Sequence, residues 1–381
     1  MKKMIIFKIM AVFFIAGNTF AFDMKQIQIH GFVSQGFLKS DENDFFFANT
    51  EKGTFEFNEL GLNFTSQLTD QLRLGIQFLS RDLGDYGNND VEIDWAYGDY
   101  RYRNWLGIQA GRMKIVQGFY NQSRDIDAAR TCIFLPSAYN EAYRDSQSHV
   151  TGISLYGTLP AGFEYQFQYG KLNIEEDGAA VKAAERAMGL KSEGVEVDSD
   201  SCIFHMLWNT PLEGLRFAGN YLWNFSWSLS TPIGEIDNDS DIWFLSAMYS
   251  WRNFSFVAEG GQANSKVSMG DMTLADSTAE TYYGMITYRF TDWLEVGSYY
   301  GELYPNKDDK DGDNFLKHNQ PAAKAWLKDF AVFSRFDITD NWIFKIEAHY
   351  MDGLATVTYS SSDVNPSEEA FLFAAKATFT F

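Results

Sequence analysis

The sequence predicts an all-β protein: a transmembrane antiparallel up-and-down β-barrel of about 16 strands. Three observations favour this fold. Apolar and polar side chains alternate along many segments, tight turns interleave with longer polar segments, and the composition is rich in aromatic residues yet polar overall. Successive side chains of a strand point to opposite faces, so we expect one face toward lipid and the other toward water.

The N-terminus has the features of a secretory signal peptide. Lys2 and Lys3 precede an apolar run over residues 4–16, and residues 19–21 form a small-x-small cleavage site. The run is too short to cross about 30 Å of hydrocarbon as a helix. We therefore expect cleavage after Ala21, with residues 1–21 as leader and residues 22–381 as the barrel.

The composition excludes several classes of protein. Aromatic residues make up 17% of the chain, there are only 7 prolines, and the mean hydropathy is −0.27. No apolar run of helix-spanning length follows the leader, so membrane-spanning helices are not expected. The net charge of −20 argues against nucleic-acid binding, which needs a basic surface.

Alternation is clearest at the C-terminus. One face of the last predicted strand carries Phe371, Phe373, Ala375, Ala377, Phe379 and Phe381. The other face carries Ala374, Lys376, Thr378 and Thr380. The same period of two runs through residues 71–78 and 163–169, and it places Lys345 between Phe344 and Ile346.

The breaks between these segments fall into two kinds. Tight turns are predicted at residues 68–71, 103–105, 160–162, 211–214, 251–253, 290–293 and 338–342. Longer polar loops are predicted at residues 39–53, 82–90, 114–147, 173–199, 230–239, 267–277, 305–323 and 357–367. Their interleaving defines 16 strands with short periplasmic turns and long external loops, the asymmetry of outer-membrane barrels. Trp105, Trp251, Trp293 and Trp342 flank turns and suit a periplasmic aromatic girdle, and residues 179–190 predict an amphipathic helix in the fourth loop.

With its leader, its 16-strand alternation, its long third loop and its terminal Phe381, the chain resembles the Gram-negative outer-membrane porin superfamily of trimeric, 16-stranded barrels. The resemblance covers essentially the whole mature chain as architecture, without a diagnostic motif. It implies a bacterial outer-membrane location, contact with lipid and lipopolysaccharide, a homotrimer, and Phe381 as a signal read by the barrel-assembly machinery.

The resemblance also implies that the third loop, residues 114–147, folds inward and narrows a pore. The charged residues expected at this constriction are Arg124, Asp125, Asp127, Arg130, Glu141, Arg144 and Asp145. The apolar residues 133–136 could pack the loop against the wall. Facing charges of both signs would create a transverse field that favours dipolar solutes. The alternative is a solvated surface loop.

Further charged residues sit beside apolar neighbours and should point into the lumen near its periplasmic end. They are Arg73, Arg216, Arg289, Arg335, Lys345, Glu164 and Glu295, joined by Asp337 and Glu347. As a set they indicate a hydrated channel of mixed charge. For each residue alone, ordinary pairing of polar groups along an aqueous wall is the preferred interpretation.

Two weaker patterns remain open. Cys132 and Cys202 should lie on the same side of the membrane, where they could form a disulfide or remain free thiols. The run that contains Asp309, Asp311 and Asp313 hints at calcium but lacks the EF-hand spacing, so a solvated acidic loop is the preferred interpretation.

No cofactor, zinc spacing or catalytic motif is recognisable, so an enzyme is not expected. The function that the resemblance implies is passive diffusion of small hydrophilic solutes and ions past a charged constriction. Two alternatives are a substrate-selective channel and a barrel that sheathes a periplasmic partner protein.

Overall fold

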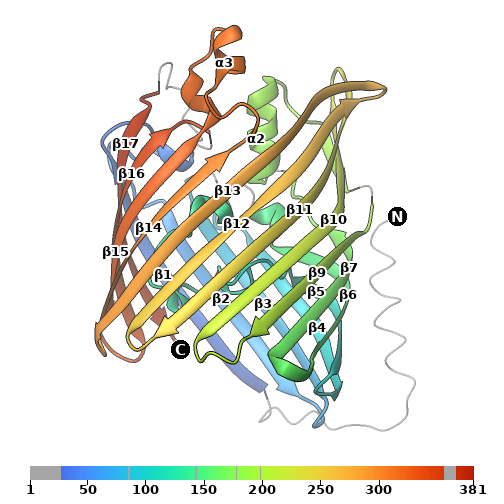
Figure 1. Cartoon of the computed structure of the whole chain (residues 1–381), viewed down its shortest axis with the longest axis vertical. Helices are drawn as coiled ribbons and strands as arrows, with labels where there is room; N and C mark the ends of the chain where they lie inside the picture. The colour runs from blue at the N-terminus through green and yellow to red at the C-terminus, as the bar shows by residue number, and fades with distance from the viewer. Residues whose placement is uncertain (1–26, 85, 142–143, 177, 198, 356–365) are drawn as a thin grey trace.

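The computed structural model describes residues 27–84, 86–141, 144–176, 178–197, 199–355 and 366–381. The predicted leader lies outside the described residues. The strands form one antiparallel sheet that closes on itself, because β1 pairs with both β2 and β17 (Figure 1). Closure leaves no open sheet edge, which a membrane would not tolerate.

The first half of the barrel contains β1 (Ile27–Ser40), β2 (Phe57–Gln67), β3 (Leu72–Leu83), β4 (Val91–Arg103), β5 (Leu106–Lys114), β6 (His149–Thr158), β7 (Phe163–Leu172), β8 (Gly194–Val197) and β9 (Ser201–Asn209). The second half contains β10 (Leu215–Thr231), β11 (Gly234–Trp251), β12 (Phe254–Met269), β13 (Met272–Thr291), β14 (Leu294–Tyr304), β15 (Leu327–Asp337), β16 (Trp342–Gly353) and β17 (Glu369–Thr380). Both β8 and β9 pair with β10, so they count as one interrupted strand of a closed 16-stranded barrel. The predicted fold class is confirmed.

The predicted alternation also holds in the structure. In β17, Phe371 is 56% exposed on the outer face, whereas its neighbour Leu372 is 1% exposed on the inner face. Lys376 and Thr378 follow Leu372 on the inner face and are buried. The four tryptophans that flank turns are exposed, as a girdle requires.

All seven tight turns lie between the expected strands. Two of the eight predicted long loops are wrong, and most of another, 357–367, lies outside the described residues. Residues 230–239 and 267–277 belong to two long hairpins that project at the top of Figure 1. Only Pro232 and Ile233 separate β10 from β11, and only Gly270 and Asp271 separate β12 from β13. The strands of both hairpins continue through sequence that is rich in Asp, Ser and Thr, so polar residues there do not signal a loop.

Helices are few. The predicted helix of the fourth loop is confirmed as α2 (Ala179–Met188), and α3 (Asp313–Lys317) lies in the loop between β14 and β15. Short 3₁₀ turns occur at Phe45–Phe47, Asn121–Ser123, Asp127–Ala129, Ser137–Tyr139, Asp145–Gln147, Pro160–Gly162 and Ala322–Ala325. No helix among the residues that the structure describes has the length and hydropathy to cross a membrane.

Candidate pore and its inner loop

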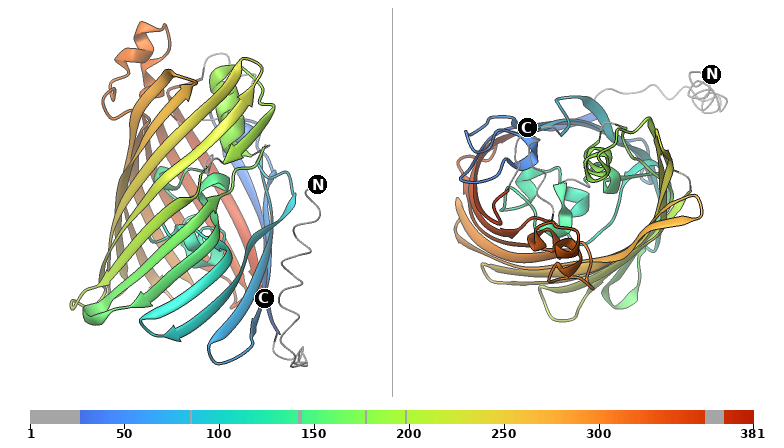
Figure 2. Two further views of the ribbon diagram at one scale, coloured as in Figure 1. Left: turned by 90° about the vertical axis from the view of Figure 1, so that its right-hand side faces the viewer. Right: turned by 90° about the horizontal axis from the view of Figure 1, so that it is seen from above.

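The segment between β5 and β6, residues 115–148 and here called L3, lies inside the ring of strands (Figure 2). Its start is fixed by Gln168 of β7, whose amide donates to the carbonyl of Lys114 at 2.8 Å and accepts from the backbone N–H of Val116 at 3.1 Å. Farther on, the N–H of Phe119 donates to Glu259 of β12 at 2.8 Å. L3 therefore crosses the lumen from the β5–β7 wall toward the opposite wall.

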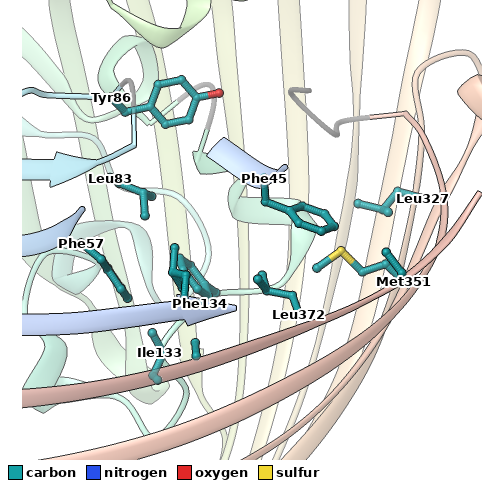
Figure 3. Packing of buried hydrophobic residues seen from close by; sticks show 12 residues of the cluster. Phe45, Phe57, Leu83, Tyr86, Ile133, Phe134, Leu327, Met351 and Leu372 are labelled. Atoms are coloured by element: carbon teal, nitrogen blue, oxygen red, sulfur yellow. The ribbon is translucent and has the colours of Figure 1, made fainter. Parts of the chain in front are cut away.

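An apolar cluster holds the middle of L3 against the barrel wall. Ile133, Phe134 and Leu135 are buried, so the predicted apolar patch packs against the wall. Figure 3 shows Ile133 and Phe134 within this cluster. The Phe134 ring is stacked between Phe46 and Phe57, with centroids 5.2 and 5.3 Å away. Fully burying one such side chain contributes about 1.5–3 kcal/mol, so this patch is a substantial anchor.

Asp127 forms the lower of two charged anchors. Its carboxylate lies 3.0 Å from Lys345 Nζ of β16 and 3.5 Å from Lys376 Nζ of β17. Thr378 donates a further hydrogen bond to it at 2.8 Å. Burial alone would raise the pKa of Asp127, but the two lysines and Arg130 outweigh it and lower the pKa. This carboxylate is charged at neutral pH and ties L3 to two strands.

Glu141, Arg144 and Asp125 form the upper anchor. Arg144 contacts Glu59 of β2 at 3.1 Å and Glu141 at 3.4 Å, and it also pairs with Asp125. Glu141 accepts from Arg81 of β3 at 2.8 Å, and its carboxylate lies 3.3 Å from Arg124. Burial would raise the pKa of Glu141, yet the surrounding arginines, above all Arg144, lower it to about 2.

The structure thus brings the predicted constriction residues together in the interface between L3 and the wall. Arg124, Asp125, Asp127, Arg130 and Arg144 are buried, and Arg130 donates to the carbonyls of Arg124 and Ile133. The side chain of Asp145 lies outside the described residues. Their role in a transverse field across the pore stays a prediction.

Several predicted lumen residues contact L3 directly and therefore point inward. Arg335 donates to the carbonyl of Ala128 at 2.6 Å, and Glu295 accepts from Thr131 at 2.8 Å. Glu347 accepts from the backbone N–H groups of Ile133 and Phe134. The inner wall of β14–β16 therefore binds the backbone of L3 as well as its charges.

The remaining predicted lumen residues lie nearer the periplasmic end. Arg289 pairs with Glu295 at 2.9 Å and with Asp337 at 3.0 Å. Arg216 lies 5.4 Å from the Phe119 ring centroid, so it also meets L3. Arg73 pairs with Asp99 at 3.4 Å and stays 48% exposed, and Glu164 accepts from Asn209 at 2.8 Å.

A polar cavity of about 260 Å³ lies between L3 and the wall of β4, β6, β7 and β9. Val116 and Gln122 of L3 line one side of it. The wall contributes Arg101, Tyr156, Glu164, Gln166 and His205. Sequence reasoning missed Arg101, Tyr156 and His205 as lumen residues, although the period of two that places Gln166 inward would have found them.

Within residues 122–129 of L3, the side chains that are exposed to open space are uncharged. Gln122, Ile126 and Ala129 are exposed, whereas Arg124, Asp125 and Asp127 between them are buried. L3 therefore turns its charges toward the wall and toward each other.

The two cysteines are free thiols, so of the two alternatives the disulfide is not formed. Cys132 is buried inside the barrel with Leu135 and Tyr139, and burial raises the pKa of its thiol to about 12. Cys202 lies in β9 opposite Tyr169 of β7. Its side chain points away from the lumen, because the next residue, Ile203, faces the lumen. The two side chains thus lie on opposite faces of the sheet.

In the acidic run between β14 and β15, Asp309 forms a hydrogen bond within its own loop. Asp309 accepts from the backbone N–H of Asn314 at 3.2 Å, at the start of α3. Among the residues that the structure describes, no three His, Cys, Asp or Glu side chains gather as metal ligands would. The calcium hint at Asp309, Asp311 and Asp313 gains no support from this arrangement.

A closed 16-stranded barrel is the fold of outer-membrane porins of known structure. Three solved structures share it: an anion-selective porin from Comamonas acidovorans, the outer membrane channel DcaP of Acinetobacter baumannii, and OprB of Pseudomonas putida. They are 14%, 11% and 9% identical to this chain, with TM-scores of 0.59, 0.57 and 0.61. The matches cover 93%, 93% and 94% of this chain and 99%, 97% and 94% of the others. No protein-family model and no curated protein matches the sequence. The chain has the porin fold.

Proposed function

We propose that the protein is a bacterial outer-membrane porin that lets small hydrophilic solutes and ions diffuse passively, without catalysis. One observation carries this proposal: L3 is held inside a closed barrel, beside a polar cavity of about 260 Å³. In a packed core, side chains would fill this space, whereas a water-filled passage requires a polar cavity.

In the proposed mechanism L3 narrows the passage sterically, and its charges keep it in place. Solutes pass between the exposed residues of L3, such as Gln122, and the wall that carries Arg101, Glu164 and His205. Polar and charged groups on that wall replace part of a solute's hydration shell and so select for hydrophilic molecules. The charged constriction then arises from the wall together with the anchored loop.

Assembly and location extend the proposal. One of the similar structures is the trimer form of OmpT from Vibrio cholerae, 10% identical to this chain over 93% of its length, with a TM-score of 0.56. We propose a homotrimer in the outer membrane, exported with removal of residues 1–21, folded by the barrel-assembly machinery and surrounded by lipid and lipopolysaccharide. A barrel that sheathes a partner protein is less compatible with L3, which already crosses the lumen.

Single-channel recording of the refolded chain without its leader tests the function. We expect an ohmic current, and a larger unitary conductance when residues 120–140 are deleted, because L3 then no longer narrows the lumen. A matched variant that lacks residues 308–318 of the β14–β15 loop should conduct like the wild type. If deleting residues 120–140 left the conductance unchanged, L3 would not be the constriction.

A further inference from the structure

Two charged groups on the wall of the polar cavity, Arg101 and Glu164, have no ion-pair partner among the described residues. Around L3, cations such as Arg144 and Lys345 pair with carboxylates. The Arg101 guanidinium lies 5.7 Å from the Tyr156 ring centroid, and Glu164 accepts a hydrogen bond from the neutral amide of Asn209 at 2.8 Å. Each group therefore keeps most of its capacity for a charged ligand.

Both charges line the same cavity, and they stand too far apart to pair with each other. Arg101 enters from β4 and Glu164 from β7, with β5 and β6 between these strands. Neutral hydrogen-bonding groups line the same space: Gln166 and His205, which are opposite each other in the β7–β9 register, and Gln122 of L3. Asp99 is nearby but already accepts from Tyr156 at 2.5 Å and pairs with Arg73.

Nδ1 of His205 adds an independent sign that the cavity is built for a ligand. It is buried and has no hydrogen-bond partner within the described residues. A buried polar atom without a partner is costly, and a polar solute or water in this cavity would satisfy it.

We propose that this cavity is a binding subsite for small zwitterionic solutes, molecules that carry a carboxylate and an ammonium group on adjacent carbons or one carbon, as amino acids do. This inference rests on the proposed porin function. Arg101 binds the carboxylate, for which a guanidinium is geometrically suited, and Glu164 binds the ammonium group. A simple anion gains from Arg101 but is repelled by Glu164, and a simple cation meets the reverse, so only a solute with both charges benefits from both groups.

The test uses four solutes of nearly equal size on the wild-type channel: alanine, lactate, alaninamide and lactamide. They carry, in order, both charges, only the negative charge, only the positive charge, and none. Single-channel KCl current is recorded while each is added. We expect saturable block by alanine at concentrations where the other three have no effect. Equal block by alanine and lactamide would overturn the inference, and because this measurement needs no variant, a folding failure cannot obscure it.

Variants then assign the charges. In R101Q and in E164Q the alanine concentration for half block should rise roughly five-fold or more, as expected on loss of one partly exposed charged contact. Lactate should block E164Q better than wild type, and alaninamide should block R101Q better than wild type, because each variant removes the repelling charge. R252Q removes an exposed arginine from the β11–β12 turn and should match the wild type.

The outcomes separate the two proposals. If the refolded protein carries no KCl current at all, the porin function fails. If KCl conductance is normal in every variant but alanine block is unchanged in R101Q and E164Q, the porin function stands and the zwitterion subsite is wrong.

Discussion

Asp127 is the residue on which most of the lower anchor depends. It is the one carboxylate that pairs with both Lys345 and Lys376, and all three side chains are buried. Lys376 also has Glu59 at 2.5 Å, whereas in the described ion pairs Lys345 has only Asp127. Removing the Asp127 charge would leave Lys345 buried without a counter-charge.

We therefore expect Asp127→Asn to destabilise the seating of L3 by about 3 kcal/mol, the cost of leaving one member of a buried ion pair unpaired. The loop should detach part of the time, so the channel should show a larger and noisier conductance, and trypsin should cleave after Arg124 or Arg130. Asp311→Asn removes the same charge from an exposed loop and serves as control. Wild-type conductance together with resistance to trypsin in Asp127→Asn would contradict this role.

Glu141 gives the upper anchor a defined pH dependence. Its pKa is lowered from 4.5 to about 2, because Arg144, Arg124 and Arg81 outweigh the effect of burial. A carboxylate with a depressed folded-state pKa stabilises the folded state fully above its unfolded pKa and loses that contribution as the pH falls through the folded pKa. For Glu141 the shift corresponds to about 3 kcal/mol at neutral pH, lost between about pH 5 and pH 2.

Conductance should therefore be constant from pH 8 to pH 5 and should become larger and noisier toward pH 2. Glu141→Gln should show the altered conductance already at pH 7 and a weaker change on acidification. Asp125 and Asp127 keep part of the loop in place, since their pKa values are lowered as well. A wild-type channel with the same conductance at pH 7 and pH 2.5 would show that this anchor does not hold L3.

Among the elements, the two long hairpins and L3 differ in where they lie relative to the barrel. The hairpin tips around Ile233 and Gly270 are exposed and project from the barrel, whereas L3 is enclosed by it. Val267 pairs with Ala275, and Lys266 with Asp276, so the tip of the β12–β13 hairpin can be removed without changing the register below it.

Replacing residues 267–275 by Asn-Gly should leave folding and conductance unchanged, because this two-residue turn suits a hairpin and the removed residues lie outside the lumen. Mobility of the folded and heated protein on gels and single-channel recording measure the two properties. A marked fall in conductance would instead assign the hairpin a place at the pore entrance.

The same elements show how far sequence reasoning reaches. The faces of β17 and of β7 follow directly from alternation of residues such as Phe371 and Leu372. The hairpin tips could not be predicted from alternation. A strand that extends beyond the lipid has no apolar face, so its sequence resembles that of a polar loop. The anchors of L3 could not be predicted from alternation either, because Asp127 and Lys376 are distant in sequence. The sequence also does not distinguish a charged residue that faces water from one that has a buried partner. Sequence therefore located the loop and its charges, and only the fold revealed which way the charges point.

For the whole molecule, the proposed function requires that one wall separates lipid from water. Gln109 and Ala110 are neighbours in β5, and they occupy opposite faces. Gln109 is opposite Asp99 and Ser154 in the sheet, on the face where Asp99 receives the Tyr156 hydroxyl, whereas Ala110 is exposed on the outer face. Substituting Arg at each of these adjacent positions therefore tests whether the outer face contacts lipid and whether the inner face contacts water.

Ala110→Arg should destabilise the barrel in a lipid bilayer by about 2–4 kcal/mol, because the charge must enter or deform the apolar phase. Gln109→Arg should change stability little, since the proposed channel has a hydrated lumen and Asp99 lies across the strand pair. Urea-dependent unfolding in vesicles measures both free energies, and single-channel recording should show altered current only for Gln109→Arg, where the new charge faces the passage. If both substitutions were equally harmless in vesicles, the outer face would not be in contact with lipid. A hydrated lumen would then lose its physical basis, because the barrel is a channel only if its wall holds hydrocarbon on one side and water on the other.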